Sequence, residues 1–320
     1  MHLWLTSKFM RLTKIKGQIL KILKKEKGIV SGEALSSEIG ISRVSIWKHI
    51  RKLQELGYNI AVNTKGYQLI DSPDALFPWE FPERESKIHF FPEVTSTMDI
   101  AQKLARNGCP HFTVVIAGRQ KNGRGRLKRP WQSSEGGLYF TIVLRPQIPP
   151  LLSLRLNFAA SLVLAQLLRR MYCVNAMVKW PNDILINKRK ISGILSEIVA
   201  ESDIASFINI GFGINVNNDP TEEEPSATSL RSITGKKISR KQLLAEFLDE
   251  FENYINHTDI DKIIPEWKNY TTTLNRHVKI VTNQDTSEGT AVDVDENGEL
   301  ILQLADGSIK KIVYGDCFHI

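Results

Sequence analysis

The chain has 320 residues, 42% of them hydrophobic, and a formal net charge of +7, so it is long enough for two or three folded units that each bury a core. Its apolar opening, residues 1–5, is interrupted by Lys8 and Arg11, far short of the roughly 18 residues that a membrane span needs. The basic residues also follow the apolar stretch, whereas a signal peptide has them in front, so a membrane or secreted protein is excluded and a cytoplasmic one is predicted.

The positive charge lies almost entirely at the start of the chain. Residues 1–72 hold 13 Lys and Arg against 5 Asp and Glu, a net charge of +8, whereas the remaining residues hold 29 against 30. Such a distribution is typical of a domain that binds a polyanion, and composition alone leaves a merely soluble, charged module as the alternative.

The three cysteines, Cys109, Cys173 and Cys317, are odd in number, far apart and outside any CxxC spacing. This pattern indicates neither a disulfide framework nor a zinc site, so we expect reduced thiols that take part in packing.

The basic N-terminal segment has the pattern of a helix-turn-helix. A first helix is predicted from apolar residues at three- and four-residue steps, namely Leu12, Ile15, Ile19, Ile22 and Leu23. A short second helix follows, with Ser31 as its N-cap, Leu35 and Ile39 as its apolar residues, and Gly40 as the residue that ends it.

A third helix is predicted to begin after Ser42, which caps it, and to turn Trp47, Ile50 and Leu53 inward. Two helices joined by a tight turn that contains glycine make a helix-turn-helix, whose second helix enters the major groove of DNA. Polar and basic side chains on its outer face, with the helix caps and the hairpin beyond, are suited to base edges or phosphates. The predicted DNA-contacting residues are Ser31, Ser42, Arg43, Ser45, Lys48, His49, Lys52 and Lys65.

Two short strands complete a winged helix-turn-helix over residues 1–72. They are Tyr58–Val62 and Tyr67–Ile70, on either side of a hairpin turn with a basic tip at residues 63–66. Three prolines follow closely, so a semi-rigid linker is predicted over residues 73–84.

A glycine- and arginine-rich loop follows the short apolar strand Val114–Ala117. It spans residues 118–131, GRQKNGRGRLKRPW, in which Gly123 and Gly125 let the backbone approach a ligand closely. Four cations make the loop suited to phosphate: Arg124, Arg126, Lys128 and Arg129. Neither a Walker P-loop nor a dinucleotide fingerprint is present, and such a loop on its own could equally bind RNA.

Polar residues interrupt two apolar strands further along the chain. Residues 179–183, KWPND, end a strand at Pro181, and residues 189–195, RKISGIL, return after a hairpin turn that brings Lys190 alongside. A polar cluster of this kind destabilises the strands unless partners or a ligand satisfy it. The alternative is a Lys–Asp ion pair that only holds the hairpin. A further strand, Phe207–Asn215, again ends in a polar residue.

The end of the chain predicts a helix and then a small all-β domain. Residues Arg240–Tyr254 have helical spacing. Four strands follow: His277–Thr282, Glu288–Val294, Glu299–Leu304 and Ile309–Val313. Asn-Gly at 297–298 and Asp-Gly at 306–307 favour hairpin turns between them, so we expect a barrel of the SH3-like type. The acidic run Glu222–Glu224 is interpreted as a solvated loop tip without a catalytic role.

Five motifs occur along the chain: TSTMD at residues 95–99, GRGR at 123–126, KWPND at 179–183, the Lys190 segment at 189–195 and INIGFGINVN at 208–217. In order and spacing they resemble those of biotin protein ligases, and the winged helix in front resembles that of the bacterial biotin operon repressor. The resemblance covers nearly the whole chain beyond the first dozen residues. It implies an α+β protein with three domains: the winged helix-turn-helix at 1–72, a mixed-sheet catalytic domain like those of class II synthetases at 85–270, and an SH3-like β-barrel at 271–320.

In this family ATP activates biotin as biotinyl-5′-AMP, and biotin then passes to a lysine of the biotin carboxyl carrier protein of acetyl-CoA carboxylase. Because an anion attacks an anion, cations must neutralise the transition state. The catalytic residues that the resemblance implies are Lys190, Arg124, Arg126 and Asp183. The implied biotin-binding residues are Ser96, Thr97, Met98, Gln120, Arg124, Gly125, Arg126, Lys190 and Gly193. The implied adenylate-binding residues are Arg126, Arg129, Trp131, Lys179, Asn182 and Asn215.

The sequence departs from the family pattern at two places. Met98 stands where relatives often have a polar residue, so any contact there is expected through the backbone. Leu127 and Lys128 replace the more common Arg-Gly after GRGR, so the closing motion of the loop is expected to differ.

The resemblance also implies a second activity, repression of biotin genes. Biotinyl-5′-AMP would act as corepressor and induce a homodimer that spans operator DNA. Magnesium is expected with ATP, although no dedicated protein cage for it is visible in the sequence. Two alternatives stay open, a biotin-sensing transcription factor without catalysis and a lipoate-type ligase.

Overall fold

The computed structural model describes residues 15–146, 148–201, 204–222, 224–282 and 285–320. The chain divides into two compact units at the boundary between Ile88 and His89. The predictions for Leu12 and for the apolar opening lie outside the described residues. Within the described ranges, no helix combines the length and the apolar character that crossing a membrane requires.

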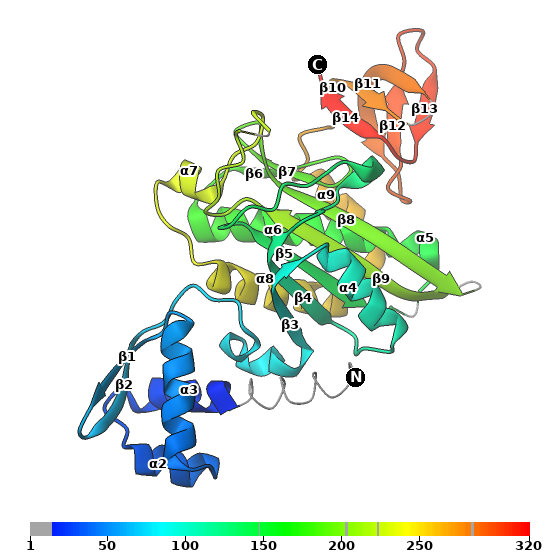
Figure 1. Cartoon of the computed structure of the whole chain (residues 1–320). Coiled ribbons are helices and arrows are strands. Elements are labelled where there is room, and N and C mark those ends of the chain that lie inside the picture. Colours follow the sequence, from blue (N-terminus) through cyan, green and yellow to red (C-terminus); the bar gives the residue numbers. More distant parts are fainter. Residues whose placement is uncertain (1–14, 147, 202–203, 223, 283–284) are drawn as a thin grey trace. The chain divides into compact units, whose positions relative to one another are not determined.

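The first unit is a winged helix-turn-helix, as the sequence predicts (Figure 1). Residues 15–26 are helical, and the elements that follow are α2 (Gly32–Ile39), α3 (Arg43–Glu55), β1 (Asn59–Asn63) and β2 (Gly66–Asp71), the last two antiparallel. The predicted caps are confirmed, because Ser31 Oγ accepts from the backbone N–H of Ala34 at 3.0 Å and Ser42 Oγ from that of Ser45 at 3.2 Å. Gly40 ends α2 with φ 73°, a left-handed conformation that favours glycine.

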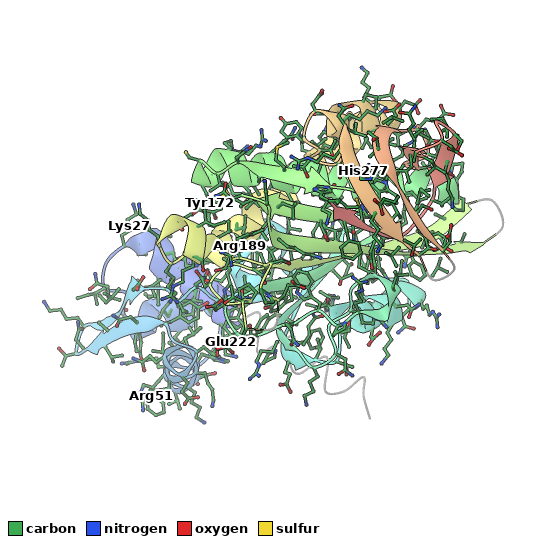
Figure 2. The ribbon with its side chains drawn as sticks, turned by 90° about the horizontal axis from the view of Figure 1, so that it is seen from above. Lys27, Arg51, Tyr172, Arg189, Glu222 and His277 are labelled. Carbon is green, nitrogen blue, oxygen red and sulfur yellow. The ribbon has the colours of Figure 1, made fainter. Side chains whose placement is uncertain are left out.

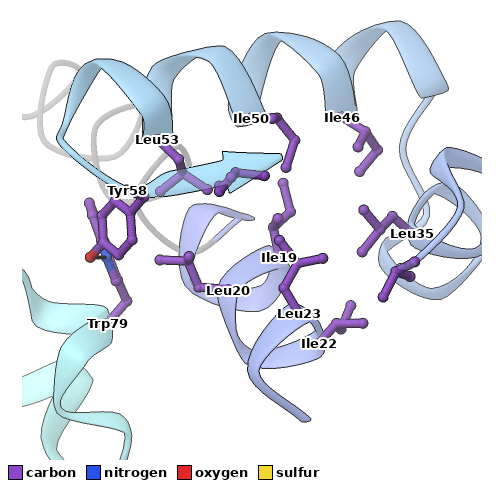
Figure 3. Packing of buried hydrophobic residues seen from close by; sticks show 12 residues of the cluster. Ile19, Leu20, Ile22, Leu23, Leu35, Ile46, Ile50, Leu53, Tyr58 and Trp79 are labelled. Atoms are coloured by element: carbon purple, nitrogen blue, oxygen red, sulfur yellow. Dashed lines mark hydrogen bonds between the residues drawn. The ribbon is translucent and has the colours of Figure 1, made fainter. Parts of the chain in front are cut away.

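The helices of this unit pack around one apolar core (Figure 3). Ile19 and Leu20 of the first helix, Leu35 of α2, and Ile46 and Ile50 of α3 are at most 1% exposed. Burial of each such side chain contributes about 1.5–3 kcal/mol, so this core determines which face of α3 points outward.

Two predictions about α3 are wrong. Trp47, expected inside, is 50% exposed, and His49, expected to contact DNA, is 7% exposed. The buried residues of α3 are Ile46, His49, Ile50 and Leu53, whose i, i+3, i+4, i+7 spacing defines one helix face. Trp47 lies about 100° further round the helix from Ile46, so the phase of this stripe, rather than side-chain size, decides its exposure.

The predicted linker is folded in part against the winged helix. It contains two 3₁₀ helices, Pro78–Glu80 and Pro82–Lys87. Trp79 is buried in the apolar core, and its Nε1 donates to the hydroxyl of Tyr58 at 2.7 Å. That hydroxyl donates in turn to Glu80 Oε1 at 2.5 Å, and Glu80 also pairs with Lys24 at 3.0 Å. Residues 78–80 therefore extend the folded unit beyond β2.

The second unit contains a seven-stranded sheet in the order β3-β4-β5-β9-β8-β7-β6. Its strands are β3 (Ile88–Val94), β4 (Thr113–Gln120), β5 (Leu138–Leu144), β6 (Ala176–Lys179), β7 (Asp183–Ile186), β8 (Arg189–Glu201) and β9 (Ile204–Ile214). The pairings from β4 across to β6 are antiparallel. The hairpin predicted around Lys190 is confirmed, because β7 and β8 pair with Ile186 opposite Arg189.

Helices cover both faces of this sheet (Figure 1). The helices of this unit are α4 (Thr97–Arg106), α5 (Pro150–Ser153), α6 (Arg155–Tyr172), α7 (Leu230–Thr234), α8 (Arg240–His257) and α9 (Ile263–Lys268). On one face Ala101 and Ala105 of α4 pack against Val115 and Phe207. On the other face the ring of Phe247 in α8 lies 5.0 Å from that of Phe212 in β9. The cleft described below opens on the α4 face.

The C-terminal segment folds as a five-stranded antiparallel sheet in the order β13-β12-β11-β10-β14. Its strands are β10 (Arg276–Val281), β11 (Thr286–Val294), β12 (Leu300–Gln303), β13 (Ile309–Ile312) and β14 (Asp316–His319). The first four were predicted and β14 was not. The turn before β12 is held by the central domain, since Trp180 Nε1 donates to Gly298 O at 3.0 Å and Arg155 Nε to Glu296 O at 2.9 Å. The α+β class and the order of the three domains are thus as predicted.

We predict that Tyr58→Phe loosens the winged helix. The change removes the acceptor of the Trp79 indole N–H and a donor to Glu80, and such a buried loss weakens a fold by about 1–3 kcal/mol. Amides of residues 15–71 should then exchange with deuterium roughly tenfold faster or more, measured by mass spectrometry on the full chain. Tyr67→Phe, in the same unit, is the control. Unchanged exchange in the Tyr58 variant would contradict the prediction.

Candidate active site

A cleft of about 1030 Å³ opens on the α4 side of the large sheet. It is lined by the start of α4, the glycine- and arginine-rich loop, the β6–β8 strands, β9 and β14. Every residue predicted from the family resemblance to act on biotin or adenylate lines it: Ser96, Thr97, Met98, Gln120, Arg124, Gly125, Arg126, Arg129, Trp131, Lys179, Asn182, Asp183, Lys190, Gly193 and Asn215. Predicted residues as far apart in the sequence as Ser96 and Asn215 thus share one cavity.

Buried hydroxyl and amide groups form one end of the cleft. Ser96 caps α4 by accepting from the backbone N–H of Met98 at 3.3 Å. Gln120 Oε1 accepts from the backbone N–H of Thr97 at 2.8 Å and from its hydroxyl at 3.1 Å, and Gln120 Nε2 donates to Ser133 Oγ at 2.9 Å. These bonds fix the donors and acceptors in place before a ligand arrives, which favours recognition of a compact polar group.

The loop at residues 123–131 is closed on itself. Gly125 N–H donates to Arg129 O at 2.8 Å, and Trp131 N–H donates to Gly123 O at 2.8 Å. A Cβ at Gly123 would lie 2.4 Å from Trp131 O, so only glycine permits this approach. Leu127, at the tip, has φ 51°, a conformation uncommon for a residue other than glycine.

The Trp131 indole lies on the glycines of the sheet. A Cβ at Gly213 of β9 would come within 2.3 Å of the indole, and one at Gly193 of β8 within 2.9 Å. On the same ring, the Lys190 ammonium lies 5.3 Å from the centroid, a cation–π distance. The buried indole Nε1 has no hydrogen-bond partner among the described residues. Glycines thus create the space, and an aromatic side chain from the loop forms a wall of it.

Lys190 lines the cleft and pairs with Asp183 at 2.8 Å. Its backbone is fixed as well, because its N–H donates to Ser226 O at 2.9 Å and its carbonyl accepts from Thr228 N–H at 2.8 Å. The pair is the Lys–Asp contact that a purely structural interpretation of the hairpin requires. However, both side chains line the cleft, so the ammonium also remains accessible to an anion.

Two arginines of the loop, Arg126 and Arg129, lie near the carboxylate of Asp316 in β14. Arg129 pairs with Asp316 at 2.5 Å, and Arg126 donates to Asn182 Oδ1 at 3.4 Å. Burial lowers the pKa of the Arg126 guanidinium, while the nearby Asp316 and Asp183 carboxylates raise it. Asp316 was not predicted from the sequence, because the short strand that carries it follows the last predicted hairpin by only a few residues.

Arg124 turns toward a different pair of acids. It contacts Asp99 of α4 at 2.9 Å and Glu197 of β8 at 3.3 Å. Neither acid was predicted as a site residue, although Asp99 belongs to the TSTMD motif. Arg124 therefore connects the loop to α4 and β8 through ion pairs. Arg129 instead pairs with Asp316 of β14, and Arg126 donates to Asn182.

Three parts of the chain match known protein families or domains. Residues 90–215 match the biotin/lipoate A/B protein ligase family, residues 273–320 the biotin protein ligase C-terminal domain, and residues 16–68 an HTH domain. The chain is 35% identical over 305 residues to the bifunctional ligase/repressor BirA of Bacillus subtilis, covering 90% of this chain and 93% of that one. The chain belongs to the biotin protein ligase family.

Other members of the family show the same relation. The bifunctional ligase/repressor BirA of Escherichia coli is 30% identical over 302 residues, covering 89% of this chain and 91% of that one. A biotin protein ligase from Aquifex aeolicus, solved in complex with biotin and ATP, is 29% identical with a TM-score of 0.62 and covers 73% of this chain and 98% of its own.

In this biotin protein ligase, Lys179 lines the cleft together with Cys317 and His319 of β14. Lys179 has its ammonium 5.9 Å from the ring of Phe318 in β14. Burial, with Lys179 and Arg276 nearby, lowers the pKa of His319 to about 4, so this imidazole is neutral at physiological pH. Burial also raises the pKa of the Cys317 thiol to about 11. His319 and Cys317 are therefore neutral groups beside Lys179 at physiological pH.

Met98 and Asn215 lie at the floor of the cleft. The Met98 side chain is buried, and its sulfur lies against Gly211 of β9, where a Cβ would come within 2.6 Å. Asn215 is buried at the end of β9, and its Oδ1 accepts from Asn218 Nδ2 at 3.0 Å. Met98 thus makes this part of the floor apolar.

The residues predicted to contact DNA fall into two groups. Arg43, Lys48 and Lys52 of α3 and Lys65 of the wing are exposed. The hydroxyls of Ser31 and Ser42 are engaged as helix caps, and Ser45 is partly buried. His49 is buried, and burial together with Lys16 lowers its pKa. Direct contact through the His49 side chain is therefore not supported.

We predict that Asp316→Asn loosens the loop at residues 123–131. Its ion pair with Arg129 is partly exposed, so removing the charge should weaken loop closure by about 1 kcal/mol or less. Trypsin should then cleave after Arg124 and Arg126 up to about fivefold faster, as followed by mass spectrometry. The control is Asp306→Asn, an exposed acid in the turn before β13. Equal cleavage of both variants and the unmodified chain would refute the role of Asp316.

Proposed function

We propose that this protein is an ATP-dependent biotin protein ligase and, through its winged helix, a biotin-responsive repressor. The ligase function is supported by one observation: Lys190, Arg126 and Arg129 line the same cleft, together with glycines of the sheet. The second part is supported by the N-terminal domain and by the relatives named bifunctional ligase/repressor.

The first step joins two anions. A carboxylate oxygen of biotin attacks the α-phosphorus of ATP, the bond to the bridging oxygen breaks, and pyrophosphate leaves with the electron pair. Charge accumulates on the phosphoryl oxygens, so cations held in place stabilise the transition state more than the separated substrates. Lys190 and Arg126 are assigned this role, with Arg124 keeping the loop over the ligand, and Arg129 and Lys179 binding the adenylate.

The second step transfers biotin to the carrier protein. The neutral amine of a carrier lysine attacks the carbonyl carbon of biotinyl-5′-AMP, the bond to the phosphate oxygen breaks, and AMP leaves as an amide forms. The amine loses one proton in this step. Asp183, a carboxylate at the edge of the cleft, is assigned to orient that amine. The groups around Ser96, Thr97 and Gln120 hold the biotin ring system.

Magnesium is expected to enter bound to ATP. Among the residues that the structure describes, no group of three or more His, Cys, Asp and Glu side chains is arranged to hold a metal ion. A cation that keeps several waters and binds through nucleotide phosphates needs no such group.

The decisive variant is Lys190→Ala. Loss of one preorganised cation should lower the rate of biotin-dependent pyrophosphate release by about 10²–10³-fold, while circular dichroism shows an unchanged fold. Lys103→Ala, an exposed lysine on α4, serves as the control and should keep full activity. Near-normal adenylate synthesis by the Lys190 variant would leave the Lys190–Asp183 pair as a purely structural contact.

A second assay, labelling of the carrier protein, separates the alternatives. Purified carrier protein, ATP and labelled biotin or lipoate are combined with the unmodified chain. Labelling by biotin supports the proposal, labelling by lipoate alone indicates a lipoate-type ligase, and no labelling by either indicates a sensor without catalysis.

The repressor role predicts that the ligand strengthens DNA binding. Biotinyl-5′-AMP should order the loop at residues 123–131 and favour a homodimer whose two winged helices occupy two half-sites. With biotin and ATP present, the affinity for a duplex selected from a random library should rise roughly tenfold in gel shifts, within the usual range of coupling between sites. Equal binding with and without the two substrates would remove the corepressor from the proposal.

A further inference from the structure

The outward face of α3 carries apolar side chains as well as charges. Val44 is 63% exposed and Trp47 50% exposed, although the opposite face of the same helix fills the core with Ile46, Ile50 and Leu53. Surface residues of this size that occur singly need no explanation, but two on consecutive turns of one helix form a patch.

Basic side chains surround this apolar patch. Arg43 and Lys48 are exposed beside it, and the Arg51 guanidinium, labelled in Figure 2, lies 6.0 Å from the Trp47 ring. Positions 44, 47 and 51 follow the i, i+3, i+7 spacing of a single helix stripe. Lys52 lies at the edge and is paired with Glu55 at 2.8 Å. The stripe therefore presents an apolar centre between positive charges.

This combination fits duplex DNA better than a protein surface. Residues 1–72 carry a net charge of +8, which favours a polyanionic partner and opposes a second copy of the same face. In the major groove, the apolar group that a side chain meets is the 5-methyl group of thymine. Val44 is the second residue of α3, and the N-terminal residues of a recognition helix are those that reach base edges.

We propose that Val44 and Trp47 contact thymine methyl groups and give α3 a preference for particular T·A base pairs. The inference rests on the proposed DNA-binding function. It adds a specificity-determining pair that the charge pattern of the sequence did not reveal. Arg43, Lys48 and Arg51 supply phosphate and base-edge contacts around the pair, while the hydroxyls of Ser31 and Ser42 remain helix caps.

The experiment removes single methyl groups from the DNA. Duplexes that the full-length protein binds, with biotin and ATP present, are selected from a random library, and each thymine is replaced in turn by deoxyuridine, which lacks only the methyl group. At one to three positions per half-site the Kd should rise roughly fourfold, as expected for one buried methyl group. This measurement uses the unmodified protein and so does not depend on the folding of a variant.

Variants then assign the effect to residues. Val44→Ala and Trp47→Ala should bind more weakly and should each lose the uracil effect at a different thymine. Val292→Ala removes an exposed valine of the C-terminal sheet and should keep every uracil effect. Circular dichroism confirms that the exposed positions tolerate the changes.

Four results would overturn the inference. Tight and selective binding that is indifferent to every uracil substitution removes the methyl contacts and leaves the DNA-binding function intact. Uracil effects that persist in both variants assign the methyl contacts to other residues. Absence of binding to any duplex refutes the proposed DNA-binding function together with the inference. Loss of self-association in the Trp47 variant, without any uracil effect, shows that Trp47 makes a protein contact instead.

Discussion

The cleft depends on the neutralisation of its cations by carboxylates from separate elements. Lys190 pairs with Asp183 of β7, Arg129 with Asp316 of β14, and Arg124 with acids of α4 and β8. Several positive charges close together would repel one another, and these acids offset that repulsion while they connect the loop to the sheet. The same cations must be available to bind phosphate. Partly exposed ion pairs allow this, because each stabilises the fold by only about 1 kcal/mol and is easily exchanged for a contact with phosphate.

Glycine determines where the ligand space lies. Gly193 and Gly213 of adjacent strands face Trp131, and Gly211 faces Met98, so one patch of the sheet has no side chains of its own. Elsewhere the strands are packed on both sides, by α4 on one face and by α6 and α8 on the other. Any larger residue at Gly213 would displace the indole and with it the wall of the cleft beside Lys190.

Much of the fold and site could be predicted from local patterns. The loop at 118–131 and the hairpin that carries Lys190 are recognisable because glycine, proline and charge stand at fixed offsets within short segments. Asp316 was missed because its partner Arg129 is distant in sequence and β14 is short. Trp47 and His49 were misplaced because the steps from Trp47 to Ile50 and Leu53 predict one inward stripe, whereas tertiary packing buries Ile46 and His49 beside Ile50 and Leu53.

The proposed coupling of catalysis to repression places a physical requirement on this loop. A ligand shifts a conformational equilibrium only by its difference in affinity for the two states, so the loop must have an alternative of similar free energy. Leu127 has φ 51°, in a region that disfavours non-glycine residues, and three partly exposed arginine–acid contacts each stabilise this loop conformation by only about 1 kcal/mol or less. An anion that binds the arginines therefore needs to supply only a few kcal/mol to change the population of the closed loop substantially.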